Sequence, residues 1–206
     1  FVDDAIALGF LQDVAVRTLK KLGAVRDKIN QTVDALRAVE DSSQREEARM
    51  AAVIELLGIG RPSVEILIEY LQDEDWLVRE AAADLLGKIA DVRAVEPLMK
   101  RLKEDKDTGV KEISLKSLGL IGDARPVDLY LDAIPIRPLR IFAMEALAKV
   151  KNVEVLGPHM PFFEGLKNDR DGLVSYNAGV IVDKLKALAV QAGEEGVQSG
   201  KDDENE

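Results

Sequence analysis

A spacing of apolar residues that recurs along the chain constrains its fold more than any other feature. Apolar residues at positions i, i+3, i+4 and i+7 lie on one face of an α-helix. Five segments follow this spacing, with Thr32 and His159 as the exceptions: Ile29, Thr32, Val33, Leu36; Val64, Leu67, Ile68, Leu71; Val95, Leu98, Met99, Leu102; Val127, Tyr130, Leu131, Ile134; and Leu156, His159, Met160, Phe163. Helices this short cannot bury an apolar face alone, so each must pack on its neighbours.

A second helical pattern precedes three of these segments and closes the chain. Small residues recur in it, where two helices must approach closely. Its members are Val78, Ala82, Leu85, Leu86, Ile89; Val110, Ser114, Ser117, Leu118, Ile121; Leu139, Ala143, Ala146, Leu147, Val150; and, as a half-unit, Val174, Ala178, Val182, Leu185. Gly58, Gly87 and Gly119 each follow a leucine, and we expect them to end these first helices as left-handed caps.

Helix pairs that repeat with a period of roughly 30 residues are typical of an α-solenoid. The chain resembles the HEAT-like repeats of phycobilisome-lyase-type and other prokaryotic HEAT proteins. The residues that carry this resemblance are Asp75, Val78, Arg79, Ala82, Leu86, Gly87, Ile89, Asp91 and Val95. It implies an all-α, right-handed α-solenoid of about five and a half helix pairs. Tetratricopeptide repeats fit less well, because their period is about 34 residues.

Three regions follow from these patterns. Residues 1–40 are predicted to form a degenerate helical hairpin repeat that turns at Gly23, and residues 44–190 to form the HEAT-like array. Ser43 and Glu46 have the spacing of a capping box at its start. Residues 191–206 lack an apolar face and are predicted to be a disordered acidic tail. The chain begins at Phe1 and not at methionine, which suggests a fragment or a processed form, and Asp3 and Asp4 argue against a retained signal peptide.

Composition excludes several classes of function. There is no cysteine, and the net charge is −10, half of it in the predicted tail. Nucleic acid and anionic membranes attract clustered Lys and Arg, so neither is an expected partner, and no apolar run approaches the roughly 20 residues that span a bilayer. We expect a cytoplasmic protein without a cofactor or a metal.

The single histidine and the single tryptophan also favour a non-enzyme. His159 has no second histidine or cysteine to form a metal site, and HEAT-repeat hydroxylases, which hold iron through His-Glu pairs, are therefore excluded. DNA glycosylases of the HEAT-like kind are basic, whereas this chain is acidic. Trp76 could anchor a partner, but its place at a helix start favours packing between repeats. The recurring Arg79, Lys111 and Arg140, and the turn residues Asp91, Asp123 and Asn152, are interpreted as structural.

The outward side of the second helices is the predicted functional surface. The resemblance to HEAT arrays implies that these helices line the concave face of the solenoid. Positions of the second helices that do not belong to the core spacing carry apolar or aromatic residues in several repeats. These residues would form an apolar stripe flanked by charges, or they could instead widen the core contact. The predicted partner-binding residues are Ile66, Tyr70, Lys100, Arg101, Leu129, Asp132 and Phe162. The leading hypothesis is a non-catalytic scaffold that binds a segment of another protein in this groove. The alternative is a bilin lyase, or the partner subunit of one, acting on phycobiliproteins.

Overall fold

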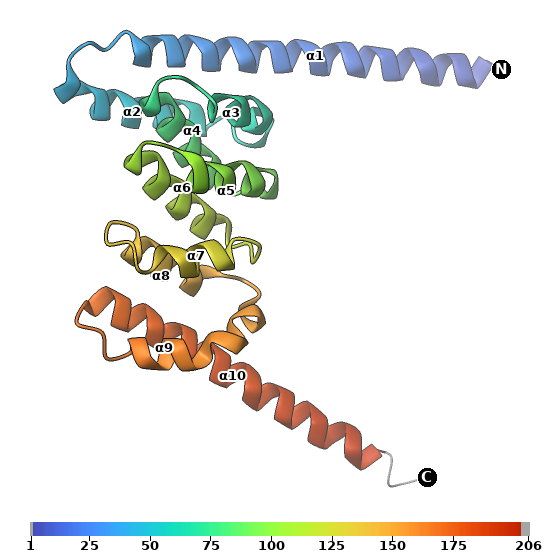
Figure 1. Cartoon of the computed structure of the whole chain (residues 1–206). Helices are drawn as coiled ribbons and strands as arrows, with labels where there is room; N and C mark the ends of the chain where they lie inside the picture. The colour runs from blue at the N-terminus through green and yellow to red at the C-terminus, as the bar shows by residue number, and fades with distance from the viewer. Residues whose placement is uncertain (1, 203–206) are drawn as a thin grey trace. The chain divides into compact units, whose positions relative to one another are not determined.

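A computed structural model describes the backbone of residues 2–202 and the side chains of residues 14–191, apart from residues 16 and 42. The described part is all-helical (Figure 1). The α-helices are α1 (Val2–Arg37), α2 (Ser42–Leu57), α3 (Val64–Tyr70), α4 (Trp76–Ile89), α5 (Val95–Glu104), α6 (Thr108–Ile121), α7 (Val127–Ala133), α8 (Arg140–Lys149), α9 (Met160–Leu166) and α10 (Gly172–Asp202). Three 3₁₀ helices, η1 (Arg61–Ser63), η2 (Val92–Ala94) and η3 (Val153–His159), lead into α3, α5 and α9.

The chain forms two compact units, Phe1–Ala94 and Val95–Glu206. In the first unit, α2 packs on α1 and α4, and α3 packs on α4. In the second unit, α6 packs on α5 and α8, α7 packs on α8, and α10 packs on α8, η3 and α9. Helices therefore pack on those that follow them closely in the chain. This all-α arrangement of about five consecutive helix pairs confirms the fold class that the sequence predicted.

The core consists of the residues that the repeat spacing predicted. In the first-helix pattern, the positions of Val110, Ser114, Ser117, Leu118 and Ile121 are at most 1 % exposed, and the matching positions of α8 and α10 are also buried. In the second-helix pattern the first and last positions of every set are buried as well. The third positions, Ile68, Met99 and Leu131, are only half-buried. Periodicity alone thus located the inward face of nearly every helix.

The first 40 residues do not form the predicted hairpin. The helix α1 runs without a break from Val2 to Arg37, through the expected turn at Gly23. Glycine inside a helix costs only about 1 kcal/mol relative to alanine, so it ends a helix only where other contacts favour a turn. Leu19 and Leu22 remain 68 % and 42 % exposed on this helix and supply no such contact.

The predicted disordered tail also differs from the structure. The helix α10 does not end near residue 190 but continues to Asp202. The prediction relied on the missing apolar face, but a helix that is already nucleated by packing at its start adds one hydrogen bond for each further residue. The last four residues lie outside the described part of the chain.

The repeat glycines are not the left-handed caps that the sequence suggested. Gly87 and Gly119 lie inside α4 and α6, and Gly58 has a right-handed φ of −62°. The left-handed caps are Ala90 (φ 55°) and Gly122 (φ 70°), three residues later. Gly119 instead marks a close helix crossing, because a Cβ atom built on it would lie 2.9 Å from the Cβ of Ala146 in α8. The absence of a side chain there lets α6 and α8 approach.

The start of α2 is capped by a different residue from the one expected. The carboxylate of Asp41 accepts hydrogen bonds from the backbone N–H of Ser43 (2.9 Å) and from its hydroxyl (2.7 Å). Glu46, the expected second half of a capping box, accepts hydrogen bonds from Arg49. Aspartate is as good an N-cap as serine, and Asp75 and Asp107 cap α4 and α6 in the same way.

Most of the recurring charges are structural, as interpreted from the sequence. Asp91 and Asp123 accept hydrogen bonds from the backbone N–H of Arg93 (3.1 Å) and Arg125 (2.9 Å) and also bind those guanidinium groups. These bonds hold the pKa of Asp91 at about 2.

The single tryptophan packs between repeats, as the sequence suggested. Arg45 of α2 lies over the Trp76 ring, 5.7 Å from its centroid, so the half-exposed tryptophan joins two repeats of the first unit.

Candidate partner-binding site

An open cavity lies in the second unit, on the side of the second helices. It has a volume of about 680 Å³, and its lining residues come from α7, the segment after it, α8, η3 and α9. They are Leu131, Asp132, Ile134, Pro135, Arg140, His159, Phe162 and Leu166. This volume is within the range of roughly 300–1,000 Å³ that is typical of ligand sites.

The sequence explains why the repeat is open at this point. Proline cannot donate a backbone hydrogen bond and disfavours a helical residue before it. Pro135 and Pro138 lie between α7 and α8, and α8 begins only at Arg140. In the next second helix, Gly157 and Pro158 give a 3₁₀ segment before the short helix α9. The segments on both sides of the cavity are therefore irregular.

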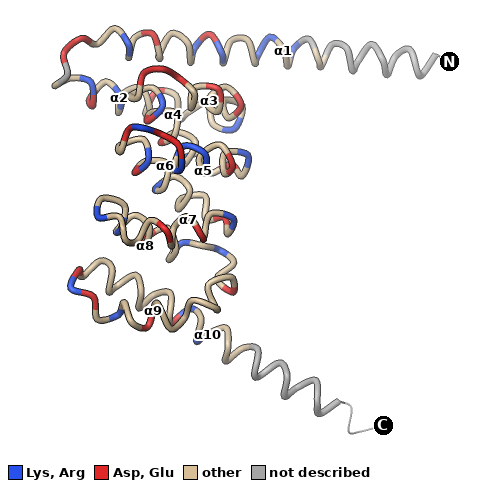
Figure 2. The backbone as a smooth tube through the Cα atoms, in the orientation of Figure 1, with Lys and Arg blue, Asp and Glu red and all other residues tan. Residues whose placement is uncertain are grey.

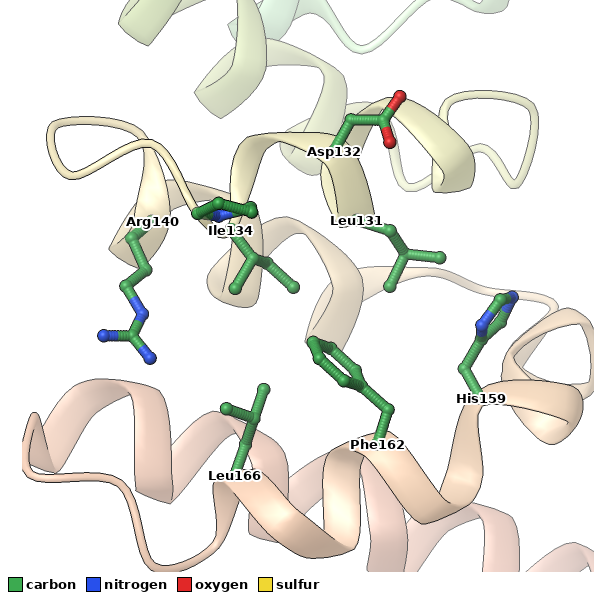
Figure 3. Close-up of a pocket in the computed structure, with 8 residues that line it drawn as sticks. Leu131, Asp132, Ile134, Arg140, His159, Phe162 and Leu166 are labelled. Atoms are coloured by element: carbon green, nitrogen blue, oxygen red, sulfur yellow. The ribbon is translucent and has the colours of Figure 1, made fainter.

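Four apolar side chains face one another across the cavity (Figure 3). Leu131 and Ile134 point from the α7 side toward Phe162 and Leu166 of α9. Phe162 is 45 % exposed, but its ring makes an edge-to-face contact with the fully buried Phe163, with centroids 5.6 Å apart. Packing of this kind holds an aromatic ring in place while one face stays open. The cavity thus offers a fixed aromatic surface to an apolar group.

Polar groups lie at the edges of the cavity. Arg140 and His159 mark its two ends in Figure 3. Arg140 donates a hydrogen bond of 2.5 Å to Asp169, and the pKa of Asp169 is lowered by a hydrogen bond from the backbone N–H of Asp171 and by Arg140. The cation of Arg140 is therefore already neutralised within the chain. Asp132 is exposed at the rim, where its carboxylate is available to a cation.

A second cavity of about 270 Å³ adjoins the first through Asp132. It is lined by Leu102, Lys103, Lys111, Leu129, Asp132, Ala133, Ile136 and Leu139. Ile136 is 48 % exposed and Leu129 is half-buried, so an apolar surface continues past the rim carboxylate. We call the two cavities together the α7 groove.

The structure brings together three of the seven predicted partner-binding residues. Leu129, Asp132 and Phe162 all line the α7 groove. Lys100 and Arg101 do not line it. Lys100 lies 4.0 Å from Glu104, and Arg101 is directed to the buried Asp105 at 3.6 Å.

The two predicted partner-binding residues of the first unit, Ile66 and Tyr70, already contact other parts of the chain. Ile66 is only 4 % exposed, so its expected place on an exposed stripe is wrong. A seven-residue helix such as α3 is surrounded on more than one side, and the 3.6-residue period does not show how many neighbours it has. Tyr70 donates a hydrogen bond of 2.7 Å to Asn30, and the adjacent Glu69 pairs with Arg26, so this side of α3 is covered by α1.

Sequence reasoning missed Leu131, Ile134, His159 and Leu166 as lining residues. The first three occupy core positions of the repeat spacing, which is why they were read as buried contacts. The available signal was the cluster of helix breakers, Pro135, Pro138, Gly157, Pro158 and Pro161, which disturbs regular stacking at this point.

The described helices carry charges of both signs. Acidic and basic residues are interspersed over the described helices of both units (Figure 2). Among the described residues, no group of three or more His, Cys, Asp or Glu is placed to hold a metal ion. No helix in that part of the chain is long and apolar enough to cross a membrane.

Comparisons with known proteins agree with this architecture. Residues 33–119 match the family model of HEAT repeats, so this segment, from the end of α1 to α6, is a HEAT-repeat segment. Among solved structures, the chain is similar to the crystal structure of an engineered protein of the Northeast Structural Genomics Consortium. The TM-score is 0.59 at 20 % sequence identity, and 84 % of each chain is covered. At that identity the likeness concerns the fold. No curated protein matches the chain.

Proposed function

We propose that the chain is a non-catalytic interaction scaffold that binds a segment of another protein in the α7 groove. HEAT repeats generally serve as protein-interaction scaffolds. The observation that carries the proposal is the open apolar cavity of about 680 Å³ with the anchored, half-exposed ring of Phe162 inside it. Exposed apolar surfaces of this kind mark binding sites more often than they occur without a role.

The groove favours a particular kind of segment. Leu131, Ile134 and Leu166 surround Phe162, so a large aliphatic or aromatic side chain fills the first cavity. Asp132 at the rim is exposed and attracts a basic residue near that anchor. Because Arg140 is paired with Asp169, it supplies no free positive charge to an acidic segment. The expected partner is therefore an apolar segment with a neighbouring Lys or Arg.

A peptide-display selection against the full chain tests this expectation. Selected peptides should share an aromatic or large aliphatic residue close to Lys or Arg. Phe162→Asp should weaken their binding at least about 30-fold in fluorescence anisotropy, the size of a hot-spot loss of roughly 2 kcal/mol. Asp132→Asn should weaken binding less, and mainly at low salt, because an exposed charge is screened.

The control is Tyr176→Asp on α10. Tyr176 is 68 % exposed, in the same unit as the groove, and lines neither cavity. Its substitution introduces the same charge and should leave binding unchanged. Peptides that bind equally well to the Phe162→Asp and Tyr176→Asp chains would show that the groove is not the site.

A tetrapyrrole ligand is the second candidate, in line with the resemblance to phycobilisome-lyase-type repeats. The size of the cavity and its apolar walls favour a small elongated molecule, with His159 at one end to meet a polar group. A bilin titrated into the protein should then shift its absorption band, and Phe162→Asp should abolish the shift. An unchanged spectrum at a tenfold excess of protein would reject this alternative.

A further inference from the structure

Among the described helices, α2 has no first helix packed against it from the N-terminal side, whereas α4, α8 and α10 each have one. In the two units, α4 packs on α2, α8 on α6, and α10 on α8. The side of α2 that would receive a preceding first helix borders an open groove of about 220 Å³ instead. It is lined by Thr32, Ala35 and Leu36 of α1 and by Ala48, Ala51, Ala52 and Glu55 of α2. We call it the α2 groove.

Equivalent positions in other helices show that this side is normally covered. Counted from the capping aspartates Asp41, Asp75 and Asp171, the tenth residue is Ala51 in α2, Leu85 in α4 and Ile181 in α10. Leu85 is 1 % exposed and Ile181 is 0 % exposed, whereas Ala51 is exposed. The difference follows from packing, because α4 and α10 each have a first helix before them. The α2 groove therefore has the shape of a missing first helix.

The same unit contains a helix segment with an exposed apolar face. On α1, Ala15, Leu19 and Leu22 are spaced i, i+4 and i+7 and share one face, and all three are exposed. The segment projects beyond the other helices of its unit (Figure 1). Exposed Lys20 and Lys21 are sequence neighbours of Leu19 and Leu22, and the exposed Glu47 directly precedes the groove residue Ala48, so these charges are of opposite sign.

The continuous helix α1 prevents this segment from covering the groove of its own chain. Leu19 and Ala35 are 16 residues apart on one helix, which at a rise of 1.5 Å per residue separates them by about 24 Å. Only a break near Gly23 would bring them together, and α1 has none. The segment can reach an identical groove on another molecule without any change in its own helix.

We propose that two copies of the chain form a symmetric dimer by exchanging the N-terminal half of α1. The apolar face around Leu19 and Leu22 of each copy covers the α2 groove of the other. The contact is isologous: the same segment and the same groove meet twice around a two-fold axis, so the exchange closes at two copies. Each copy thereby acquires the first helix that its N-terminal repeat lacks.

Cysteine cross-linking in solution tests the exchange, because the natural chain has no cysteine. Leu19→Cys and Ala51→Cys chains carrying different affinity tags are mixed and treated with a flexible bis-maleimide. The expected product contains one chain of each kind, and light scattering of the untreated native chain should give twice 22.6 kDa. The variant with both cysteines should also form cross-linked dimers.

Two results would overturn the proposal. Cross-linking of the double variant within a monomer would show that α1 turns back at Gly23 and covers its own groove. A native mass of 22.6 kDa at 100 μM with no cross-linked product would show that nothing covers the groove. Leu19→Asp should weaken dimerisation at least tenfold, whereas Leu173→Asp, a control at a 51 % exposed residue of α10, should not.

Discussion

Gly119 offers a direct test of how closely the first helices pack. It lies inside α6, where alanine is the better helix former by about 1 kcal/mol. Helix propensity alone therefore predicts that Gly119→Ala stabilises the protein. Packing predicts the opposite, because the new Cβ would lie 2.9 Å from the Cβ and 3.0 Å from the Cα of Ala146.

The magnitude follows from these distances. Carbon atoms in contact are best separated by about 3.5–4.0 Å, so α6 and α8 must move apart by roughly 0.5 Å or more. The obstructing atoms are a backbone carbon and a methyl group, neither of which can rotate away. Overpacking of this kind costs about 1–3 kcal/mol. Set against the gain in propensity, Gly119→Ala should lower the free energy of unfolding by up to about 2 kcal/mol.

The matched control is Gly179 of α10, where an added Cβ would meet no atom within 4 Å. Gly179→Ala should raise the free energy of unfolding by about 0.5–1 kcal/mol, since only the propensity changes. Urea unfolding followed by circular dichroism measures both variants. The two substitutions should shift the midpoint in opposite directions. A similar gain in both would refute the close crossing of α6 and α8.

Two further predictions concern charges in the first unit. Arg49 is buried and lies 3.4 Å from Glu80 and 3.1 Å from Asp84, and Asp84 also binds Lys88 at 2.5 Å. Because Asp84 keeps that second cation, Arg49→Ala should lower the free energy of unfolding by about 1–3 kcal/mol. A loss below about 0.5 kcal/mol in urea unfolding would contradict this. Asp91 has its pKa lowered from 3.8 to about 2, chiefly by hydrogen bonds from Arg93, so its contribution is complete above about pH 5 and disappears as the pH falls toward 2. Because Arg93 is half-exposed and screened, Asp91→Asn should cost about 1 kcal/mol at pH 6 and less than about half of that at pH 2, where Asp91 is half-protonated in the folded state. A series of urea titrations at different pH values can show this.

The sequence predicted the helix pairs and their inward faces because both depend on local spacing. The positions of Val110, Leu118 and Ile121 in α6 repeat as Leu139, Leu147 and Val150 in and next to α8, and all of them are buried. A period of 3.6 residues fixes which side chains share a face wherever the helix packs. The same reasoning failed at the glycines, which it assigned to helix caps. A glycine is needed at position 119 because α8 crosses α6 there, and only the position of Ala146 in the structure reveals that crossing.

The two ends of the chain show why helix boundaries are harder to predict. Gly23 and the acidic residues after 190 are weak stop signals whose effect is about 1 kcal/mol or less per residue. Whether a helix stops at such a residue depends on what its next turn would contact. The structure continues α1 through Gly23 and α10 to Asp202.

By itself, the sequence determined an all-α chain of stacked helix pairs, because apolar residues recur at helical spacing within each segment. It also placed Leu129, Asp132 and Phe162 on the outward side of the second helices. Only the tertiary structure decided which of these positions are open. Ile66 is enclosed by neighbouring helices, whereas Phe162 faces an open cavity between α7 and α9. Exposure depends on the spacing between helices, and no periodicity within one helix encodes that distance.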